Sequence, residues 1–225
     1  MCAERRVVVS WSGGKDAAWA LHELRHDPAV EVVGLLTTVN SAFDRVAMHG
    51  VRVELLRRQA RAAGLPLHEI PLPWPCSNEQ YESAMAASVA RIRDEWRPTH
   101  VAFGDLFLQD VRAYREERMR ETGLKPLFPL WQRPTEELAG LMIEAGVQTR
   151  IVCLDPTRVP RELAGRLLNR ELLDALPSGV DPCGERGEFH TFVTEGPMLQ
   201  GRVVVVPGDI VEREGFVFAD LVPAA

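Results

Sequence analysis

The first half of the chain alternates between short apolar runs and helical segments, and this pattern restricts the fold more than any other feature. Four apolar runs are expected to be strands: residues 6–11, 30–39, 67–72 and 99–103. Three segments between them have the apolar spacing of helices: residues 16–25, 51–63 and 77–96. Strands and helices that alternate in this way form βαβ units around a mostly parallel sheet. We therefore predict an α/β fold with a Rossmann-like parallel sheet.

The second half, beyond about residue 126, is less regular. Helices are expected at residues 135–145 and 162–176, and strands or strand-like segments at residues 149–154, 189–193, 202–206 and 215–220. We interpret this half as a smaller α+β domain. The expected boundary divides the chain into residues 1–128 and 129–225.

A glycine turn follows directly on the first expected strand, at Ser12-Gly13-Gly14-Lys15-Asp16. Two consecutive glycines allow positive φ angles and bring backbone N–H groups close to an anion. The helix that begins near Asp16 directs its free N–H groups and positive dipole end to the same place. The loop lacks the spacing of a P-loop or of a Rossmann fingerprint. We predict that it binds phosphate, against the alternative of a simple capped turn.

Lysine is rare in this chain, which has only Lys15 and Lys125 among 26 basic residues. An ammonium on a flexible stem can follow a phosphate group more easily than the rigid guanidinium of arginine. Its use within the glycine turn therefore favours a functional part for Lys15.

Three stretches fall at the carboxyl ends of expected strands: residues 12–16, Thr37–Asn40 and Gly104-Asp105. Ligands of open parallel sheets bind beyond these ends, where the strand order reverses. We therefore expect Thr37, Gly104 and the glycine turn to converge on one crevice.

An acidic and arginine-rich segment begins at Gly104-Asp105. Asp105 can hold Mg²⁺ or receive a ribose hydroxyl. Arg112, Arg115 and Arg118 recur every three residues, so on a helix they share one side and can clamp an anionic substrate. The alternative is a helix with ordinary charge pairs on its surface.

A second acidic segment, Asp181-Pro182-Cys183-Gly184-Glu185-Arg186-Gly187-Glu188, precedes His190. Its glycines indicate a tight loop that turns Glu185 and Glu188 inward. Paired acids can orient an amine, accept its proton or hold a metal. The alternative is a polar turn that leads into a strand.

His49 has two readings. It is either an ordinary polar residue on the surface or, because it lies near the phosphate loop in sequence, a residue that lies over the nucleotide.

Composition excludes several classes of protein. The formal net charge of −6 predicts no nucleic-acid partner. No apolar run reaches the roughly 18 residues of a membrane span, and no apolar leader is visible, so we expect a cytoplasmic protein. Cys2, Cys76, Cys153 and Cys183 are too dispersed for a disulfide framework or a zinc site.

Together these segments resemble the ATP-binding family that contains diphthine-ammonia ligase, within the N-type ATP pyrophosphatases of the adenine nucleotide alpha hydrolase-like superfamily. The resemblance rests on four blocks in order: residues 12–16, Gly104-Asp105 with residues 112–116, residues 123–131, and Glu185-x-Gly187-Glu188-Phe189. It implies a HUP-type nucleotide domain. Ala17 departs from the family pattern, since many relatives carry serine after the aspartate. The segments Asp181-Pro182-Cys183-Gly184-Glu185 and Met48-His49-Gly50 resemble a bacterial branch of the family.

The resemblance implies an AMP-forming amide ligase that uses ATP and Mg²⁺. A substrate carboxylate is adenylated with loss of pyrophosphate, and ammonia then displaces AMP. The residues expected to bind ATP are Ser12, Gly13, Gly14, Lys15, Asp16, Thr37, His49 and Gly104. Those expected to contribute to catalysis are Lys15, Asp105, Arg112, Arg115, Glu185 and Glu188. Asp16 and Asp105 are the expected contacts of Mg²⁺.

The acceptor remains open between diphthine, a cobamide-related carboxylate and another small-molecule or protein-borne carboxylate. A homodimer is also compatible with the family. Two other functions stay open at this point. A tRNA-modifying ATPase shares the phosphate loop, and a regulator could hold ATP without chemistry.

Overall fold

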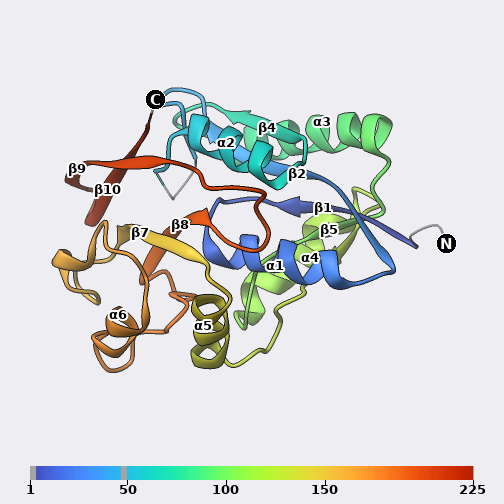
Figure 1. Cartoon of the computed structure of the whole chain (residues 1–225). Helices are drawn as coiled ribbons and strands as arrows, with labels where there is room; N and C mark the ends of the chain where they lie inside the picture. Colours follow the sequence, from blue (N-terminus) through green and yellow to red (C-terminus); the bar gives the residue numbers. More distant parts are fainter. Residues whose placement is uncertain (1–3, 47–49, 225) are drawn as a thin grey trace.

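The N-terminal sheet is built around β1 (Arg5–Ser10), which pairs in parallel with β2 (Val30–Asn40) on one side and with β5 (His100–Ala102) on the other. This arrangement comes from a computed structural model, which describes residues 4–46 and 50–224 (Figure 1). Two further parallel strands extend the sheet, β4 (Leu67–Leu72) beside β2 and β6 (Lys125–Leu127) beside β5. The short β3 (Arg45–Val46) is antiparallel to the end of β2.

The strand order places the expected crevice. Successive strands β1, β2 and β4 run toward one edge of the sheet, whereas β5 and β6 lie on the other side of β1. The order therefore reverses at β1, and the segment that follows β1 lies at the topological switch point where such sheets bind ligands.

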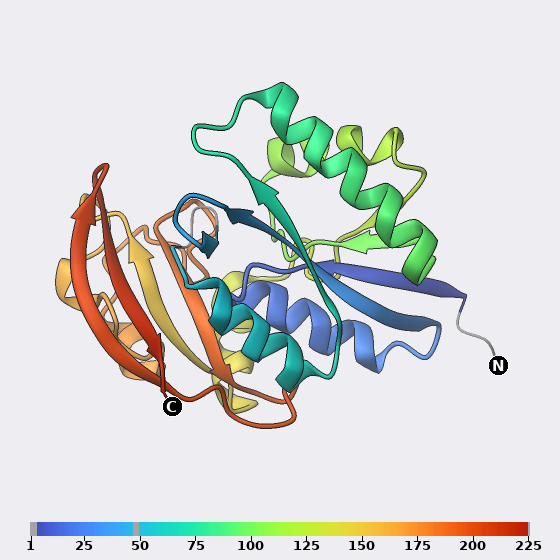
Figure 2. The ribbon, with the colours of Figure 1, turned by 90° about the horizontal axis from the view of Figure 1, so that it is seen from above.

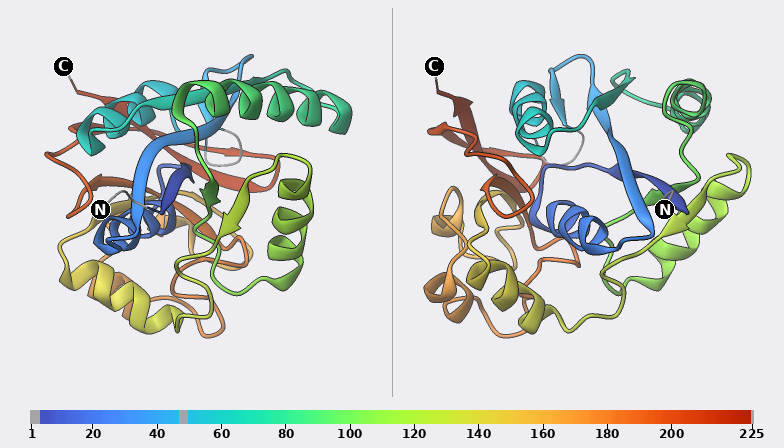
Figure 3. Two further views of the ribbon diagram at one scale, coloured as in Figure 1. Left: turned by 90° about the vertical axis from the view of Figure 1, so that its right-hand side faces the viewer. Right: turned by 45° about the vertical axis from the view of Figure 1, so that its right-hand side comes forward.

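Helices cover both faces of this sheet. The first two, α1 (Lys15–His26) and α2 (Val53–Ala63), share a core with Val7 and Val9 of β1. The opposite face carries α3 (Asn78–Trp96) and α4 (Gln109–Arg120), and Val8 points to that side. Alternate residues of a strand face opposite sides, so one apolar run supplies both cores. Figures 2 and 3 show α3 and α4 on the side away from the C-terminal strands.

The C-terminal half contains a four-stranded antiparallel sheet in the order β8-β7-β10-β9. Its strands are β7 (Gln148–Leu154), β8 (Phe189–Glu195), β9 (Val205–Arg213) and β10 (Phe216–Pro223). Its helical elements are α5 (Thr135–Glu144), a 3₁₀ helix (Arg161–Leu163) and α6 (Arg170–Asp174). The predicted α/β class, with a Rossmann-like sheet and a smaller α+β part, is confirmed.

The two halves pack against each other through one continuous core. Phe192 and Val193 of β8, with Leu221 of β10, belong to the same buried cluster as α1 and α2. The backbone N–H of Gln200 also donates to the carbonyl of Ala62 at the end of α2. No helix of the described residues is long and apolar enough to cross a bilayer.

One predicted helix is wrong. Residues 162–176 form only the short 3₁₀ helix and α6, because Gly165 has a φ of +80° and breaks the helical path. The segment between them pairs with β7, where the N–H of Leu168 donates to the carbonyl of Thr149. Asn169 then caps α6 by accepting from the N–H of Leu172.

Other boundaries differ by a few residues. The strand expected at residues 202–206 begins at Val205 and continues to Arg213. Both β3 and β6 lie outside the expected strands, since they are only two and three residues long. The capping box of α3 is confirmed, because Ser77 and Gln80 exchange side chain to backbone hydrogen bonds.

Candidate active site

A cavity of about 580 Å³ lies between the parallel sheet and helices α3 and α4, and it reaches the carboxyl ends of β1 and β5. Ser12, Thr37 and Phe103 line it from the ends of three different strands. Arg115 lines it from α4, and Tyr81 from the first turns of α3. The predicted convergence at the switch point therefore joins Ser12 and Thr37, and the size suits a nucleotide-sized ligand.

The Thr37 hydroxyl gives this cavity a specific polar feature. Thr37 is 4% exposed, and within the described part of the chain its Oγ1 has no hydrogen-bond partner. Buried hydroxyl groups are normally paired, and an unpaired one in a cavity wall indicates that a ligand group or water satisfies it.

The glycine turn is shaped by close packing. Gly13 has a φ of +79°, and a Cβ built there would lie 2.8 Å from Oε1 of Gln59. A Cβ on Gly14 would lie 3.1 Å from the carbonyl oxygen of Thr191. Glycine is therefore required at position 13 both by backbone angle and by space.

Gly104 supports the same turn from the neighbouring strand end. A Cβ on Gly104 would lie 2.8 Å from the carbonyl carbon of Asp16 and 2.9 Å from the backbone nitrogen of Ala17. The β5 end can approach the first turn of α1 this closely only because residue 104 has no side chain.

Lys15 lies between the glycine turn and the C-terminal loop. Its side chain is 2% exposed, and Nζ lies 2.8 Å from Oδ2 of Asp16. Nζ also donates to the Cys183 carbonyl and lies 5.5 Å above the Phe189 ring. Burial alone would lower the pKa of Lys15, but the charge of Asp16, its hydrogen bond to Lys15 and the nearby acidic groups of Cys183 and Glu185 together outweigh burial and raise that pKa, so the ammonium remains protonated. Ser12 lines the cavity, whereas Lys15 is directed toward the loop that contains Cys183.

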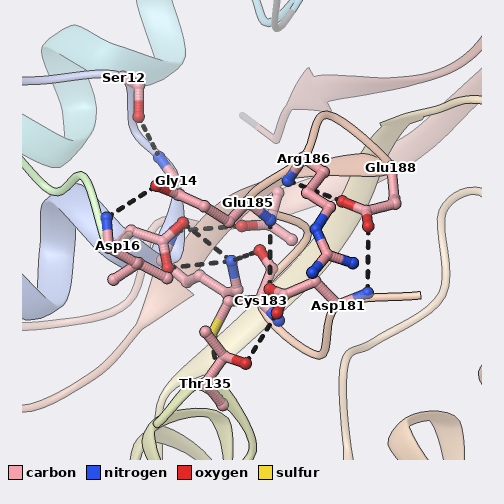
Figure 4. Close-up of polar contacts among 12 residues, drawn as sticks. Ser12, Gly14, Asp16, Thr135, Asp181, Cys183, Glu185, Arg186 and Glu188 are labelled. Carbon is pink, nitrogen blue, oxygen red and sulfur yellow. Dashed lines mark hydrogen bonds and ion pairs between the residues drawn. The ribbon is translucent and has the colours of Figure 1, made fainter. Parts of the chain in front are cut away.

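Residues from both halves of the chain meet beside the start of α1, where Figure 4 shows Asp16 close to Cys183 and Glu185. Glu185 is anchored to the segment that follows β5, because its Oε1 accepts from the N–H of Leu106 at 2.7 Å. Burial raises the pKa of Glu185 to about 7, and the charges of Asp16 and Asp105 add to this rise. A carboxylate with such a pKa is suited to general acid–base chemistry at neutral pH.

Glu188 has a different position from Glu185. It is completely buried, and its Oε1 lies 2.8 Å from Nη2 of Arg158. It also accepts from the N–H groups of Asp181 at 3.1 Å and Arg186 at 2.8 Å. These bonds close the loop of residues 181–188 on itself, so the geometry gives Glu188 a part in shaping the loop that presents Glu185.

Two arginines of α4 are held by aromatic rings. The Arg115 guanidinium lies 4.8 Å above the Phe103 ring, and its Nε is 3.4 Å from Oδ2 of Asp105. The Arg112 guanidinium lies 4.8 Å from the centre of the Phe128 ring and 4.7 Å from the centre of the Trp131 ring. Stacking of this kind fixes a guanidinium plane while leaving its edge able to form hydrogen bonds.

Arg112 and Arg118 differ from Arg115 in their surroundings. Arg112 also pairs with Glu116 at 2.7 Å, and it does not line the cavity. Arg118 lines the outer part of the cavity and pairs with Glu82. Of the predicted arginine row, Arg115 is therefore the member that joins the cavity to Asp105.

Each of the two expected metal contacts is paired with a basic side chain. Asp16 is paired with Lys15, and Asp105 with Arg115. Among residues 4–46 and 50–224 no group of three or more His, Cys, Asp or Glu side chains is arranged to hold a metal. This arrangement fits Mg²⁺ that takes most of its ligands from phosphate and water and only one or two from carboxylates.

Two histidines remain. His49 lies outside the described residues, so its expected position over the nucleotide stays a prediction. Burial lowers the pKa of His190 to about 4, with a further contribution from the charge of Lys15, so its imidazole is neutral at pH 7.

Sequence reasoning missed two polar residues that hold the glycine turn. Gln59 is fully buried on α2, between the apolar positions Leu56 and Ala60. A polar residue inside the apolar stripe of a helix was the available signal. Thr191 accepts a hydrogen bond from the N–H of Lys15 at 3.1 Å, and nothing in the local sequence distinguishes it from an ordinary strand threonine.

The chain is similar to proteins of one family over nearly its whole length. The model of the diphthamide synthase N-terminal domain matches residues 5–126, and that of the C-terminal domain matches residues 134–220. The chain is 24% identical over 242 residues to the diphthine–ammonia ligase of Bos taurus and 25% identical over 240 residues to that of Homo sapiens. Each alignment covers 95% of this chain and 88% of the relative. The chain belongs to the diphthamide synthase family.

Proposed function

We propose that this protein is an ATP-dependent ligase that forms a carbon–nitrogen bond, joining ammonia to a substrate carboxylate with release of AMP and pyrophosphate. The observation that carries the proposal is the joining of two sites around Lys15. A nucleotide-sized cavity lies on one side of the glycine turn, and the Glu185 loop lies on the other. The relatives named diphthine–ammonia ligase support the same chemistry.

The nucleotide side uses the glycine turn. We assign the backbone N–H groups of Ser12, Gly13 and Gly14 to the phosphates of ATP, supported by the position of Ser12 in the cavity wall. The unpaired hydroxyl of Thr37 suits a hydroxyl or ring nitrogen of the nucleoside. Gly104 acts through packing, since it sets the position of the α1 start, and His49 is proposed to cover the nucleotide.

Mg²⁺ is proposed to bind the phosphates near Asp16 and Asp105. Both carboxylates flank the α1 start, where phosphate oxygens would supply the remaining ligands. The ion would neutralise charge on the phosphates.

The acceptor side uses Arg115 and Arg112 to hold the substrate carboxylate in place. Its oxygen attacks the α-phosphorus, the bond to the β-phosphate oxygen breaks, and pyrophosphate leaves. Lys15, which is held and protonated beside the turn, is assigned to stabilising the negative charge that builds up on the leaving pyrophosphate. The site does not restrict the acceptor to diphthine, and other carboxylates remain candidates.

Glu185 completes the second step. Ammonia attacks the acyl carbon, AMP departs with the bonding electrons, and a proton leaves the attacking nitrogen. A carboxylate with a pKa of about 7 can accept that proton at neutral pH, and the N–H of Leu106 holds it in place. Glu188 keeps the loop closed.

We also propose a boundary between the two parts at residues 128 and 129. The match of one family model ends at residue 126 and that of the other begins at residue 134, which supports this division.

The test is product analysis with radiolabelled ATP. The protein is incubated with [α-³²P]ATP, MgCl₂, ammonium chloride and a desalted cell extract that supplies acceptors, and AMP is separated from ADP. We expect AMP that depends on both ammonium and extract. Glu185→Gln should lower its rate by about 10²-fold or more. Glu171→Gln, in an exposed residue of α6, is the matched control. Formation of ADP, or AMP that is independent of ammonium, contradicts the proposal.

A further inference from the structure

Gln59 forms a buried three-way connection beside the glycine turn. Its Oε1 accepts from Nε1 of Trp11 at 3.0 Å. Its Nε2 donates to the carbonyl of Gly13 at 3.0 Å and to that of Val193 at 2.6 Å. The indole nitrogen can only donate and the carbonyls can only accept, so the amide has one possible orientation. The side chain therefore joins Trp11, just before the turn, and Gly13, within the turn, to strand β8.

Strand β8 makes two further contacts with the same turn. The N–H of Val193 donates to the carbonyl of Gly13 at 3.0 Å, and Oγ1 of Thr191 accepts from the N–H of Lys15 at 3.1 Å. All of these groups are buried. Hydrogen bonds in such surroundings are costly to break, because the separated groups are left without water.

The strand that receives these bonds begins immediately after the loop of residues 181–188. That loop carries Glu185, and its Cys183 carbonyl accepts from Lys15. A displacement of the glycine turn therefore moves β8, and a displacement of β8 moves the Glu185 loop.

We propose that Gln59 and Thr191 are positioning residues that couple the nucleotide loop to the Glu185 loop through β8. Nucleotide bound at residues 12–14 then restrains residues 181–193, and the two reacting sites keep a fixed separation. The inference rests on the proposed function in one respect, because it requires ATP to bind at the glycine turn. It adds that the two halves of the site respond to the nucleotide as one unit.

The chemistry of the two side chains makes the proposal specific. Leucine at position 59 keeps most of the volume but leaves Trp11 Nε1 and the Val193 carbonyl without partners. Valine at position 191 has nearly the shape of threonine and loses only the acceptor for the Lys15 N–H. Serine at position 191 keeps that acceptor, so Thr191→Ser is the conservative variant.

The experiment measures amide hydrogen exchange by mass spectrometry in the full-length protein, with and without saturating MgATP. Ligand binding suppresses only those openings that disrupt its site, by up to about 100-fold at a hundred times the Kd. In the wild type we expect MgATP to slow exchange in residues 181–193 by about tenfold or more. In Gln59→Leu and Thr191→Val that slowing should fall to within about twofold. Thr191→Ser and the control Gln200→Leu, in an exposed residue, should behave as wild type.

Calorimetric titration with MgATP runs beside the exchange measurement. If the wild type does not bind ATP, the proposed function fails and this inference fails with it. If ATP binds but residues 181–193 are not protected, or if both variants keep the wild-type protection, the coupling is refuted while the proposed function stands. Should Gln59→Leu not fold, Thr191→Val and its serine partner decide the question by themselves.

Discussion

Gly104→Ala tests whether the close approach of β5 to α1 positions the nucleotide loop. Gly104 does not have a positive φ, so alanine is allowed by the backbone and the effect is one of space alone. The new Cβ would lie 2.8 Å, 2.9 Å and 3.0 Å from backbone atoms of Asp16 and Ala17. Ordinary contact begins near 3.4 Å, so the first turn of α1 must retreat by about half an ångström.

The magnitude follows from the cost of overpacking, which is about 1–3 kcal/mol when the obstructing atoms belong to the backbone. For a chain of this size a loss of about 2 kcal/mol lowers the Tm by about 4–8 °C. The retreat of α1 carries the glycine turn with it, so we expect the Kd for MgATP to rise about tenfold. Differential scanning calorimetry and isothermal titration measure the two effects.

Gly146→Ala serves as the control for this substitution. Gly146 has a φ of +81° and nothing within 4 Å of the position of a Cβ, so alanine there brings backbone strain without a clash. We expect it to cost about 1 kcal/mol and to leave ATP affinity unchanged. If Gly104→Ala has the wild-type Tm and the wild-type affinity, the packing argument for the nucleotide loop is wrong.

Three further predictions concern single side chains. With the concentration of free ammonia held constant, the rate of amide formation should rise with pH through about 7, because Glu185 accepts a proton only when ionised, and Glu185→Gln should remove that rise in a pH–rate profile. Thr37→Val should leave the free energy of unfolding within about 1 kcal/mol of wild type and weaken ATP binding about fivefold by titration, since it removes a hydroxyl that has no partner among the described residues; a destabilised variant with unchanged affinity contradicts this. Burial favours the neutral form of Asp220, but hydrogen bonds from Arg52 and Arg45 outweigh it and hold its pKa below the usual range. Asp220→Asn should therefore cost about 1–2 kcal/mol at pH 7 in urea melts, and the difference should shrink below about pH 4 as the wild-type carboxylate is protonated; a difference that does not vary with pH speaks against the ion pairs.

The N-terminal fold could be predicted because its elements are long and regular. The run Arg6–Trp11 and the helix that follows Gly14 each carry a strong local pattern, and parallel βαβ units leave few alternatives for their arrangement. The C-terminal half could not be predicted as well. Residues 162–176 look helical by their apolar spacing, but Gly165 and pairing with β7 override that preference.

The candidate site, too, could be predicted from the sequence only in part. Gly13 follows β1 and Thr37 lies in the last part of β2, so their convergence could be anticipated from strand order alone. The direction of the Lys15 side chain toward Cys183 depends on a contact between residues 168 positions apart, which no local pattern encodes. The same holds for Gln59, whose partner Val193 is 134 positions away.

The buried cluster shared by α1, α2 and β8 bears on how this chain acquires its structure. The family models describe two successive modules, but Phe192, Val193 and Leu221 fill the outer side of the nucleotide module. A fragment that stops near residue 128 would leave the apolar sides of both helices in water, with its glycine turn no longer braced. Because one core joins the two parts, we expect them to unfold together, and we expect the glycine turn of a growing chain to be held in place only after β8 has been synthesised.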